Sequence, residues 1–523
     1  MTRTVARGTV QTSALHDFTV KVDASGLEPG HTYYYAFELD GERSPVGRTR
    51  TLPAQGAARL SAALVSCSNY PAGFFNVYGC INRRPDIDAI IHVGDYIYEF
   101  AEGEYGVGKQ IGRVPDPAHE AITLADYRMR YATYRTDPDL QESHRLFPFI
   151  AVWDDHEITN DAWSGGAINH NPEKGEGSYA VRQRAAYQAY LEWMPIRESR
   201  DPGIRLYRTF HIGGLVDLIM LDTRGLRDRQ ASNTDAAAIA DPNRTLLGAA
   251  QERWMFDELR SSMRSGAAWR LLGQQVMFSQ ASLAGITRIN TDSWDGYQGQ
   301  RTRVLDMLER ESVSNVAILT GDAHSSWGFD VGRDPWHAYR PATGQGSLAV
   351  EIVTPAISSP AFFSNPGDDA IVAALKVALP HLKFMDGTRR GYVLLDITHR
   401  PAAAVRRRFP NIAAALERHG FDLTQDPIPV VPAAHYTCGG VMTDLQARTD
   451  VDHLYAFGET ACTGLHGANR LGGNALTEAL VFGTRAGERA ASWAKEVSPV
   501  ARRMVEPHNL DTTGATADEI YSS

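Results

Sequence analysis

The sequence predicts an α/β fold over its central part, and three observations favour this class. The composition, with 43% apolar, 22% charged and 9% aromatic residues, is that of a globular protein with sizeable cores. Between about residue 59 and residue 398, short apolar runs alternate with helix-like segments. Most of these runs end in residues that bind metal or phosphate, and ligands of α/β sheets collect beyond the carboxyl ends of the strands.

At 523 residues the chain is long enough for two or three domains. We expect the first domain at residues 1–54, where segments 17–24 and 31–39 alternate apolar and polar residues around the turn sequence GLEPG. These strands are too few to build two complete sheets. The start of the chain is therefore expected to be a partial, truncated β-sandwich.

Residues 55–398 are expected to form the α/β domain. Segments 123–135 and 182–194 have the spacing of helices, and the second ends before Pro195. The predicted strands are the apolar runs within segments 58–70, 87–100, 146–157, 215–224, 269–279, 316–327 and 347–355.

The net charge of the chain excludes few classes of function, but it argues against some classes of binding partner. A formal charge of -10 and a pI near 5.9 give no general attraction to nucleic acid or to anionic lipid. No apolar run is long enough to cross a bilayer, and the opening segment lacks the apolar core of a signal peptide. We therefore expect no leader and no membrane anchor, while the compartment and the oligomeric state stay open.

Two short motifs place metal-binding side chains directly after apolar strands. VGDYIYE carries Asp95 and Tyr98, and LTGDAHSSW carries Asp322 and His324. Cys67 ends another strand, and a disulfide from it to Cys80 is conceivable although the chain has no CxxC pair. Taken singly, these residues are also consistent with a turn aspartate, a core tyrosine, a core histidine and a buried apolar cysteine.

A third motif, VWDDHE, places Asp154, Asp155 and His156 in succession after an apolar strand, with Asn160 close behind. Adjacent carboxylates repel each other, so a divalent or trivalent cation is their natural compensation. The alternative is a solvated acidic loop. Four strand ends that all supply such side chains favour one shared metal site.

The order SC, GDxxY, WDDHE and GDxH resembles the PhoD-like alkaline phosphatases of the calcineurin-like metallophosphoesterase superfamily. The resemblance covers about two thirds of the chain and implies a double β-sheet core flanked by helices, with a mixed Fe(III) and Ca(II) site. By motif, iron would be bound by Cys67, Asp95 and Tyr98, with Asp322 and His324 completing the set, and calcium by Asp154 or Asp155 and Asn160. Thiolate and phenolate suit Fe(III), and carboxylate and amide oxygens suit Ca(II).

The implied activity is hydrolysis of a phosphate monoester or diester by metal-activated water. The residues expected to take part in catalysis are Asp95, Asp155, His156 and His324, while Arg128 or Arg224 could assist. A phospholipase D-like activity on lipid headgroups also stays open. The loops at 100–120 and 163–178 would decide among these substrates.

The last expected domain, 399–523, is a fragment that resembles a different protein family over about residues 395–495. HYTCGG and the later GET and LGGNALTEAL segments are similar to the closing part of L-aspartate oxidase and of the succinate dehydrogenase/fumarate reductase flavoproteins. The resemblance implies a substrate-binding role for His435 and a substrate-carboxylate contact for Arg470. It also implies flavin contacts for Glu459, Ala475 and Leu476.

The chain lacks the GxGxxG turn that holds the diphosphate of a dinucleotide, because GVGKQIG at 106–112 has the wrong spacing. We therefore expect a fused flavoprotein fragment without bound FAD. The different-class alternatives are a flavoprotein-type oxidoreductase and an inactive fusion protein. A natural accessory domain and an artefactual or engineered junction also stay open as origins of this segment.

Overall fold

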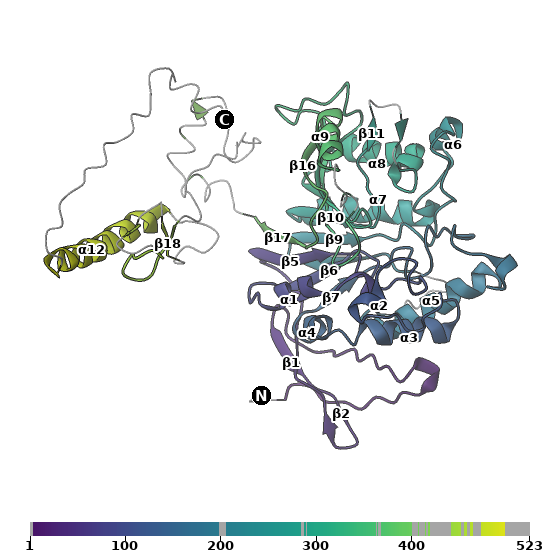
Figure 1. The fold of residues 1–523 in the computed structure, drawn as a ribbon. Helices are drawn as coiled ribbons and strands as arrows, with labels where there is room; N and C mark the ends of the chain where they lie inside the picture. The colour runs from purple at the N-terminus through teal and green to yellow at the C-terminus, as the bar shows by residue number, and fades with distance from the viewer. Residues whose placement is uncertain are drawn as a thin grey trace. The chain divides into compact units, whose positions relative to one another are not determined.

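The computed structural model describes two compact units, residues 1–428 and 429–523 (Figure 1). The described residues are 4–197, 205–283, 287–288, 290–361, 363, 368–399, 406, 414, 417–418, 441–450, 454–457, 461–463 and 472–496. The first unit contains two mixed β-sheets with helices around them, so the α/β class predicted for the central segment is confirmed.

The smaller sheet has four strands in the order β17-β5-β6-β7. Strands β5, β6 and β7 are parallel, and β17 pairs antiparallel with β5. The four strands span β5 (Arg59–Val65), β6 (Ala89–His92), β7 (Phe149–Ala151) and β17 (Val393–Thr398).

The larger sheet has seven strands in the order β16-β14-β15-β13-β10-β9-β8. Its central strands β9, β10, β13 and β15 are parallel, and antiparallel strands flank them on both sides. The bounds are β8 (Arg208–Ile212), β9 (Val216–Met220), β10 (Trp269–Gly273), β13 (Val316–Thr320), β14 (Ser326–Gly332), β15 (Ser347–Val353) and β16 (Leu382–Asp386).

The two sheets share one apolar core and meet at their carboxyl ends. Leu64 and Ile91 of the smaller sheet belong to the same buried cluster as Leu218 and Leu319 of the larger one. After β5 and β15 the chains form a parallel bridge between Ser66 and Ala356. Because parallel strands of both sheets end at this edge, the loops that follow them converge there.

Helices lie along both sheets, with α1 to α5 beside the smaller sheet and α6 to α9 beside the larger one (Figure 1). Local sequence fixes several of their ends: α3 starts with a capping box between Thr123 and Asp126, and α4 starts at Pro138 after the N-cap Asp137. The bounds are α1 (Asn76–Asn82), α2 (Gly108–Ile111), α3 (Leu124–Tyr134), α4 (Pro138–Leu146), α5 (Tyr179–Trp193), α6 (Ala236–Ala240), α7 (Gly248–Ser265), α8 (Gln298–Arg310) and α9 (Asp368–Ala378).

The N-terminal segment forms short antiparallel strands. β1 (Thr32–Tyr35) pairs with β4 (Gly47–Arg50), and β2 (Glu38–Leu39) pairs with β3 (Glu42–Arg43). The strand predicted for 17–24 is wrong, because no strand forms there. Side chains hold this segment instead: Asp17 accepts a hydrogen bond of 3.0 Å from the Trp193 indole, and Asp23 pairs with Arg197 at 2.7 Å.

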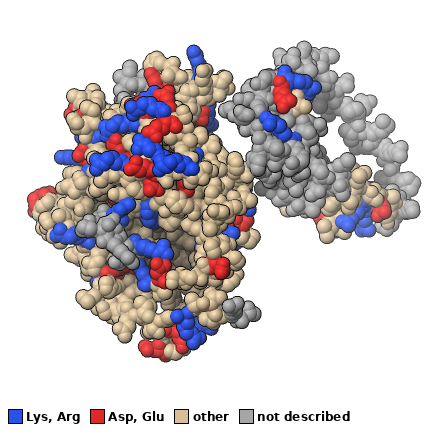
Figure 2. Space-filling view, turned by 180° about the vertical axis from the view of Figure 1, so that it is seen from behind, with Lys and Arg blue, Asp and Glu red and all other residues tan. Residues whose placement is uncertain are grey.

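The described part of the second unit contains the strands β18 (Val441–Met442) and β19 (Ala461–Cys462) and the helix α12 (Gly472–Glu496). The strands pair in parallel, and Ala447 packs against Phe482 and Ala486. Among the described residues, no helix combines the length and the hydropathy required to cross a membrane. Figure 2 shows basic and acidic side chains interspersed on one face of the molecule.

Candidate metal centre

The predicted metal-binding residues come together at the edge where both sheets end. Three groups form, and within each group the potential ligand atoms lie within 4.8 Å of one another. Asp95 and Asp155 each belong to two groups, so the three groups make one continuous cluster. The groups are Cys67 with Asp95 and His324, Asp95 with Asp155 and His156, and Asp154 with Asp155 and Asp322.

Sharp backbone turns place four of these side chains. Cys67, Asp95, Asp322 and His324 have positive φ angles of 60°, 57°, 59° and 47°, respectively. Each such conformation costs a non-glycine residue about 1–3 kcal/mol and persists only where the surroundings enforce it. Strain at these strand ends is therefore concentrated on residues predicted to bind metal.

Tyr98 lies inside the cluster. Its hydroxyl donates to the Oδ2 atom of Asp95 at 3.0 Å and lies 3.1 Å from Nε2 of His324. Its ring stacks on His156 with a centroid distance of 4.2 Å. The thiol of Cys67 is buried beside this ring, and both Cys67 and Cys80 are free, so the conceivable disulfide between them is not formed.

Burial makes the negative forms of these groups costly in the absence of a cation. Burial and neighbouring carboxylates raise the pKa of Asp95 and of Asp322 to about 8. Burial likewise raises the pKa of the Cys67 thiol and of the Tyr98 hydroxyl well above their usual values. A bound cation would favour the ionised forms of all four groups.

Histidines on the two sides of the cluster have opposite electrostatic surroundings. Burial lowers the pKa of His324 to about 4, so this ring is neutral and has a lone pair for a metal. Burial acts the same way on His156, but the negative charges of Glu99, Asp155 and Asp95 outweigh it and raise the pKa of His156 well above the usual value. These carboxylates therefore favour the protonated form of His156.

Arg224, which follows β9, is the cationic side chain that balances part of this acidic cluster. It is 1% exposed and contacts Asp154 through Nε, while Nη1 lies 2.7 Å from Asp292 and Nη2 lies 3.2 Å from Asp322. The other expected candidate, Arg128, pairs instead with Glu192 at 2.6 Å. The structure thus brings Arg224 to the site, and Arg128 binds elsewhere.

Two buried glutamates that the sequence interpretation did not single out hold the loops after β6 and β7. Glu157 accepts backbone N–H groups at the ends of both strands. Glu99 accepts from Nδ1 of His156 at 2.8 Å and from the backbone N–H of Asn160 at 2.6 Å. The only available signal was their position inside the DYIYE and WDDHE motifs, since an isolated carboxylate is rarely buried without partners.

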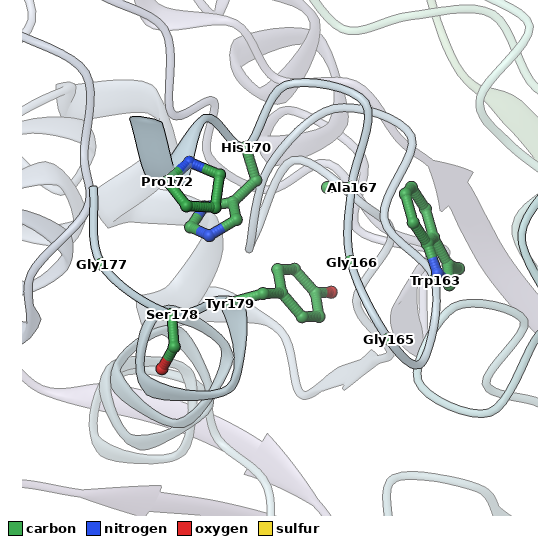
Figure 3. A pocket seen from close by; sticks show the side chains of 9 residues that line it. All are labelled: Trp163, Gly165, Gly166, Ala167, His170, Pro172, Gly177, Ser178 and Tyr179. Atoms are coloured by element: carbon green, nitrogen blue, oxygen red, sulfur yellow. The ribbon is translucent and has the colours of Figure 1, made fainter. Parts of the chain in front are cut away.

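A pocket of about 610 Å³ lies on the loop between β7 and α5, and Figure 3 shows its walls. The His170 and Tyr179 rings meet edge to face with centroids 5.5 Å apart, and Arg229 lies 5.3 Å from the centre of the Trp163 ring. The Thr159 hydroxyl donates to the carbonyl of Asn169 at 2.9 Å, which joins this loop to the segment that carries Asn160. The pocket is lined by Trp163, Gly165, Gly166, Ala167, His170, Pro172, Gly177, Ser178 and Tyr179.

The residues of the flavoprotein resemblance fall in the second unit of the chain, 429–523. His435, Glu459 and Arg470 lie outside the described residues, and Ala475 and Leu476 are part of α12 in the second unit.

Comparisons with known proteins agree with this division. The family model for PhoD-like phosphatase matches residues 62–405, and the model for the N-terminal domain of PhoD-like phosphatase matches residues 1–53. The chain is 37% identical to alkaline phosphatase D of Bacillus subtilis (strain 168) over 465 residues, which cover 85% of this chain and 76% of that protein. A solved structure of PhoD superposes with a TM-score of 0.64 at 36% identity, covering 72% of this chain and 71% of that one.

The C-terminal match is to another family and is short. An FAD binding domain model matches residues 377–476. The chloroplastic L-aspartate oxidase of Oryza sativa subsp. japonica is 66% identical over 95 residues, which are 18% of this chain and only 15% of that oxidase. This region is therefore a partial fragment. By its match over most of its length, the chain belongs to the PhoD-like phosphatases, a family of phosphoric ester hydrolases.

Proposed function

We propose that the protein hydrolyses phosphate monoesters or diesters with a water molecule activated by two unlike metal ions. The observation that carries this proposal is the continuous cluster of buried ligands, which has a sulfur and phenol side around Cys67 and a carboxylate side around Asp154. Such a mixture of donors suits Fe(III) on the first side and Ca(II) on the second.

The donor set fits metal ions on an independent ground. Among the described residues, the Oδ1 atom of Asp95 and the Oδ2 atom of Asp154 are buried and make no hydrogen bond, and the Oδ1 atom of Asp155 makes none either but lies 3.4 Å from Nη2 of Arg224. A buried carboxylate oxygen without a partner is costly, and a cation would satisfy it.

We assign Cys67, Asp95, Tyr98 and His324 to the iron side. Asp154, Asp155 and Asn160 would hold the calcium side. Asp322 was expected to complete the iron set by motif, but its grouping with Asp154 and Asp155 supports a place on the calcium side. Bound metals would supply a hydroxide at neutral pH and positive charge for the phosphoryl oxygens.

The other residues orient groups and move protons. Glu99 fixes the ring of His156 through Nδ1, which leaves Nε2 as the free ring nitrogen. The free Nε2 atom leads us to assign His156 the transfer of a proton to the leaving oxygen. Arg224 holds three of the acidic side chains in place.

The test is elemental analysis of the purified protein together with hydrolysis of 4-nitrophenyl phosphate and bis(4-nitrophenyl) phosphate, with and without Ca(II). We expect bound iron and calcium-dependent turnover that is lost in Asp95→Ala. The matched control Glu28→Gln changes an exposed carboxylate in the N-terminal segment and should behave as the unmodified protein. A soluble protein with neither metal nor turnover would contradict the proposal.

We also propose the domain limits 1–54, 55–398 and 399–523, with the last segment as a flavoprotein fragment that binds no FAD. The short coverage of the oxidases supports this assignment. An absorption spectrum of the purified protein tests it, because bound flavin would colour the protein yellow.

A further inference from the structure

Arg390, in the loop between β16 and β17, contacts a residue that touches the sulfur and phenol side of the cluster. Its Nε–H donates to the backbone carbonyl of Ser359 at 2.9 Å. The hydroxyl of Ser359 lies 2.8 Å from the Tyr98 oxygen and 3.1 Å from the carbonyl of Cys67. One residue therefore separates the guanidinium group from two of the proposed iron ligands.

A second contact places Arg390 near His324. The residue after Ser359, Pro360, has its carbonyl oxygen 3.1 Å from Nδ1 of His324. The hydroxyl of Tyr105 lies 3.2 Å from the same ring nitrogen of His324. Through Pro360, the segment that anchors Arg390 therefore also contacts a third proposed iron ligand.

Arg390 differs from the other arginines near the site because only the Nε–H group of its guanidinium makes a hydrogen bond within the described residues. It is exposed, and within the described ranges its contact with Ser359 is the one hydrogen bond recorded for its side chain. Arg224, by contrast, is buried and surrounded by four aspartates, so its donors are already used. The neighbouring Arg389 is 86% exposed and pairs with Asp386 at 3.4 Å.

We propose that Arg390 binds the non-bridging oxygens of the substrate's phosphoryl group and thereby favours dianionic monoesters over monoanionic diesters. This inference rests on the proposed phosphoester hydrolysis and goes further by naming the charge class of the substrate. A guanidinium forms short, charge-assisted hydrogen bonds to phosphate oxygens. Its attraction is greater for a group with about two negative charges than for a diester with one.

The test compares Arg390→Gln with the control Arg389→Gln in the metal-loaded full chain. At a pH above 7, where the monoester is a dianion, kcat/KM for 4-nitrophenyl phosphate should fall about 10- to 150-fold in Arg390→Gln. The fall for bis(4-nitrophenyl) phosphate should be clearly smaller. Arg390→Lys, which keeps the charge, should recover part of the loss, and bound metal should be unchanged in all variants.

Direct titration with inorganic phosphate separates this inference from the proposed hydrolysis. If the unmodified protein hydrolyses neither ester, the proposed function fails, yet Arg390→Gln should still bind phosphate more weakly than Arg389→Gln. Equal losses for both esters would overturn the charge preference. Phosphate binding that is the same in both variants would overturn the role of Arg390 altogether.

Discussion

The carboxylate of Glu157, in the loop after β7, accepts the backbone N–H of Asp95 at the end of β6 over 3.0 Å. The same side chain accepts from Tyr96 at 2.6 Å and from Asp154 at 2.8 Å. Glu99, in the loop after β6, reaches in the opposite direction to His156 and Asn160. Each of the two loops is thus fixed by hydrogen bonds to a glutamate of the other loop. The strained conformation of Asp95 depends on these hydrogen bonds.

Glu157→Gln should weaken both the fold and the metal site. The amide has one acceptor oxygen, and its NH2 group would face a backbone N–H that has lost its partner. We expect a loss of about 1–3 kcal/mol in the free energy of unfolding. Metal affinity should fall about 10- to 100-fold, as for other residues that orient ligands. Denaturant unfolding and metal titration of the metal-free protein measure the two effects.

Glu173→Gln is the control, because Glu173 is exposed in the loop before α5. A Glu157→Gln protein that binds metal as tightly as this control would show that the glutamate is not required to position the ligands.

Arg224→Met should be among the most destabilising single substitutions in the metal-free protein. It removes a buried cation from contact with four aspartates and leaves their charges uncompensated. The expected cost is about 3–5 kcal/mol in the free energy of unfolding, measured in urea. Arg260→Met removes an exposed pair with Glu311, whose two charged atoms lie 2.7 Å apart, and should cost about 0–1 kcal/mol. Equal costs in the two variants would refute the role given to Arg224.

The stability of the metal-free protein and its affinity for metal should depend on pH in opposite directions. Asp95 and Asp322 have pKa values of about 8 in the folded metal-free protein, above the usual carboxyl value. The folded state therefore holds more protons than the unfolded state between about pH 4 and pH 8, so the metal-free protein loses stability as the pH rises through this window. Metal binding needs the ionised forms of these carboxylates, so metal affinity should rise with pH across this window.

Calorimetric titration with metal at pH 6, 7 and 8, in buffers of different ionisation enthalpy, measures the protons released. We expect proton release at pH 6 and 7, with the share from Asp95 and Asp322 decreasing toward pH 8 while the Cys67 thiol and the Tyr98 hydroxyl still release protons when iron binds. Metal binding without proton release at pH 6 would mean that these carboxylates are already ionised in the metal-free protein.

Short motifs made most of the site predictable. Cys67, Asp95 and Asp322 follow apolar strands within a few residues, so the rule that ligands collect at the carboxyl ends of strands was enough to group them. The partners of Arg224 and Arg390 could not be inferred, because each contact joins segments far apart in the sequence. Arg224 and Asp154 are 70 residues apart, and nothing local indicates their meeting.

Alternation of apolar and polar residues predicted the strands less well than the short motifs predicted the candidate site. Segment 17–24 has the pattern of a strand, but a strand also requires a partner with free backbone groups, and here side-chain contacts to Trp193 and Arg197 hold the segment instead. The residues of the candidate site were predictable because several polar side chains follow one another in short motifs, whereas strand pairing depends on the whole fold.

The position of β17 predicts where the chain can be cut. β17 completes the smaller sheet by pairing with β5 from Val393 opposite Leu64 to Thr398 opposite Arg59. The Arg59 to Asp396 pair at 2.6 Å and a bond of 3.3 Å from the Trp269 indole to the carbonyl of Thr398 fix its far end. A chain ending after His399 keeps all of these contacts and should retain the metal content and turnover of the full chain.

A chain ending after Gly391 lacks β17 and exposes the edge of β5, whose side chains are almost all buried. We expect this shorter chain to aggregate or to unfold at a lower temperature, while the longer one remains monodisperse in size-exclusion chromatography and keeps its melting temperature. If the longer chain also lost metal and turnover, the boundary at residue 398 would be wrong, and part of the flavoprotein-like segment would belong to the phosphatase fold. If both chains behaved like the full-length protein, the pairing of β17 with β5 would contribute little to stability.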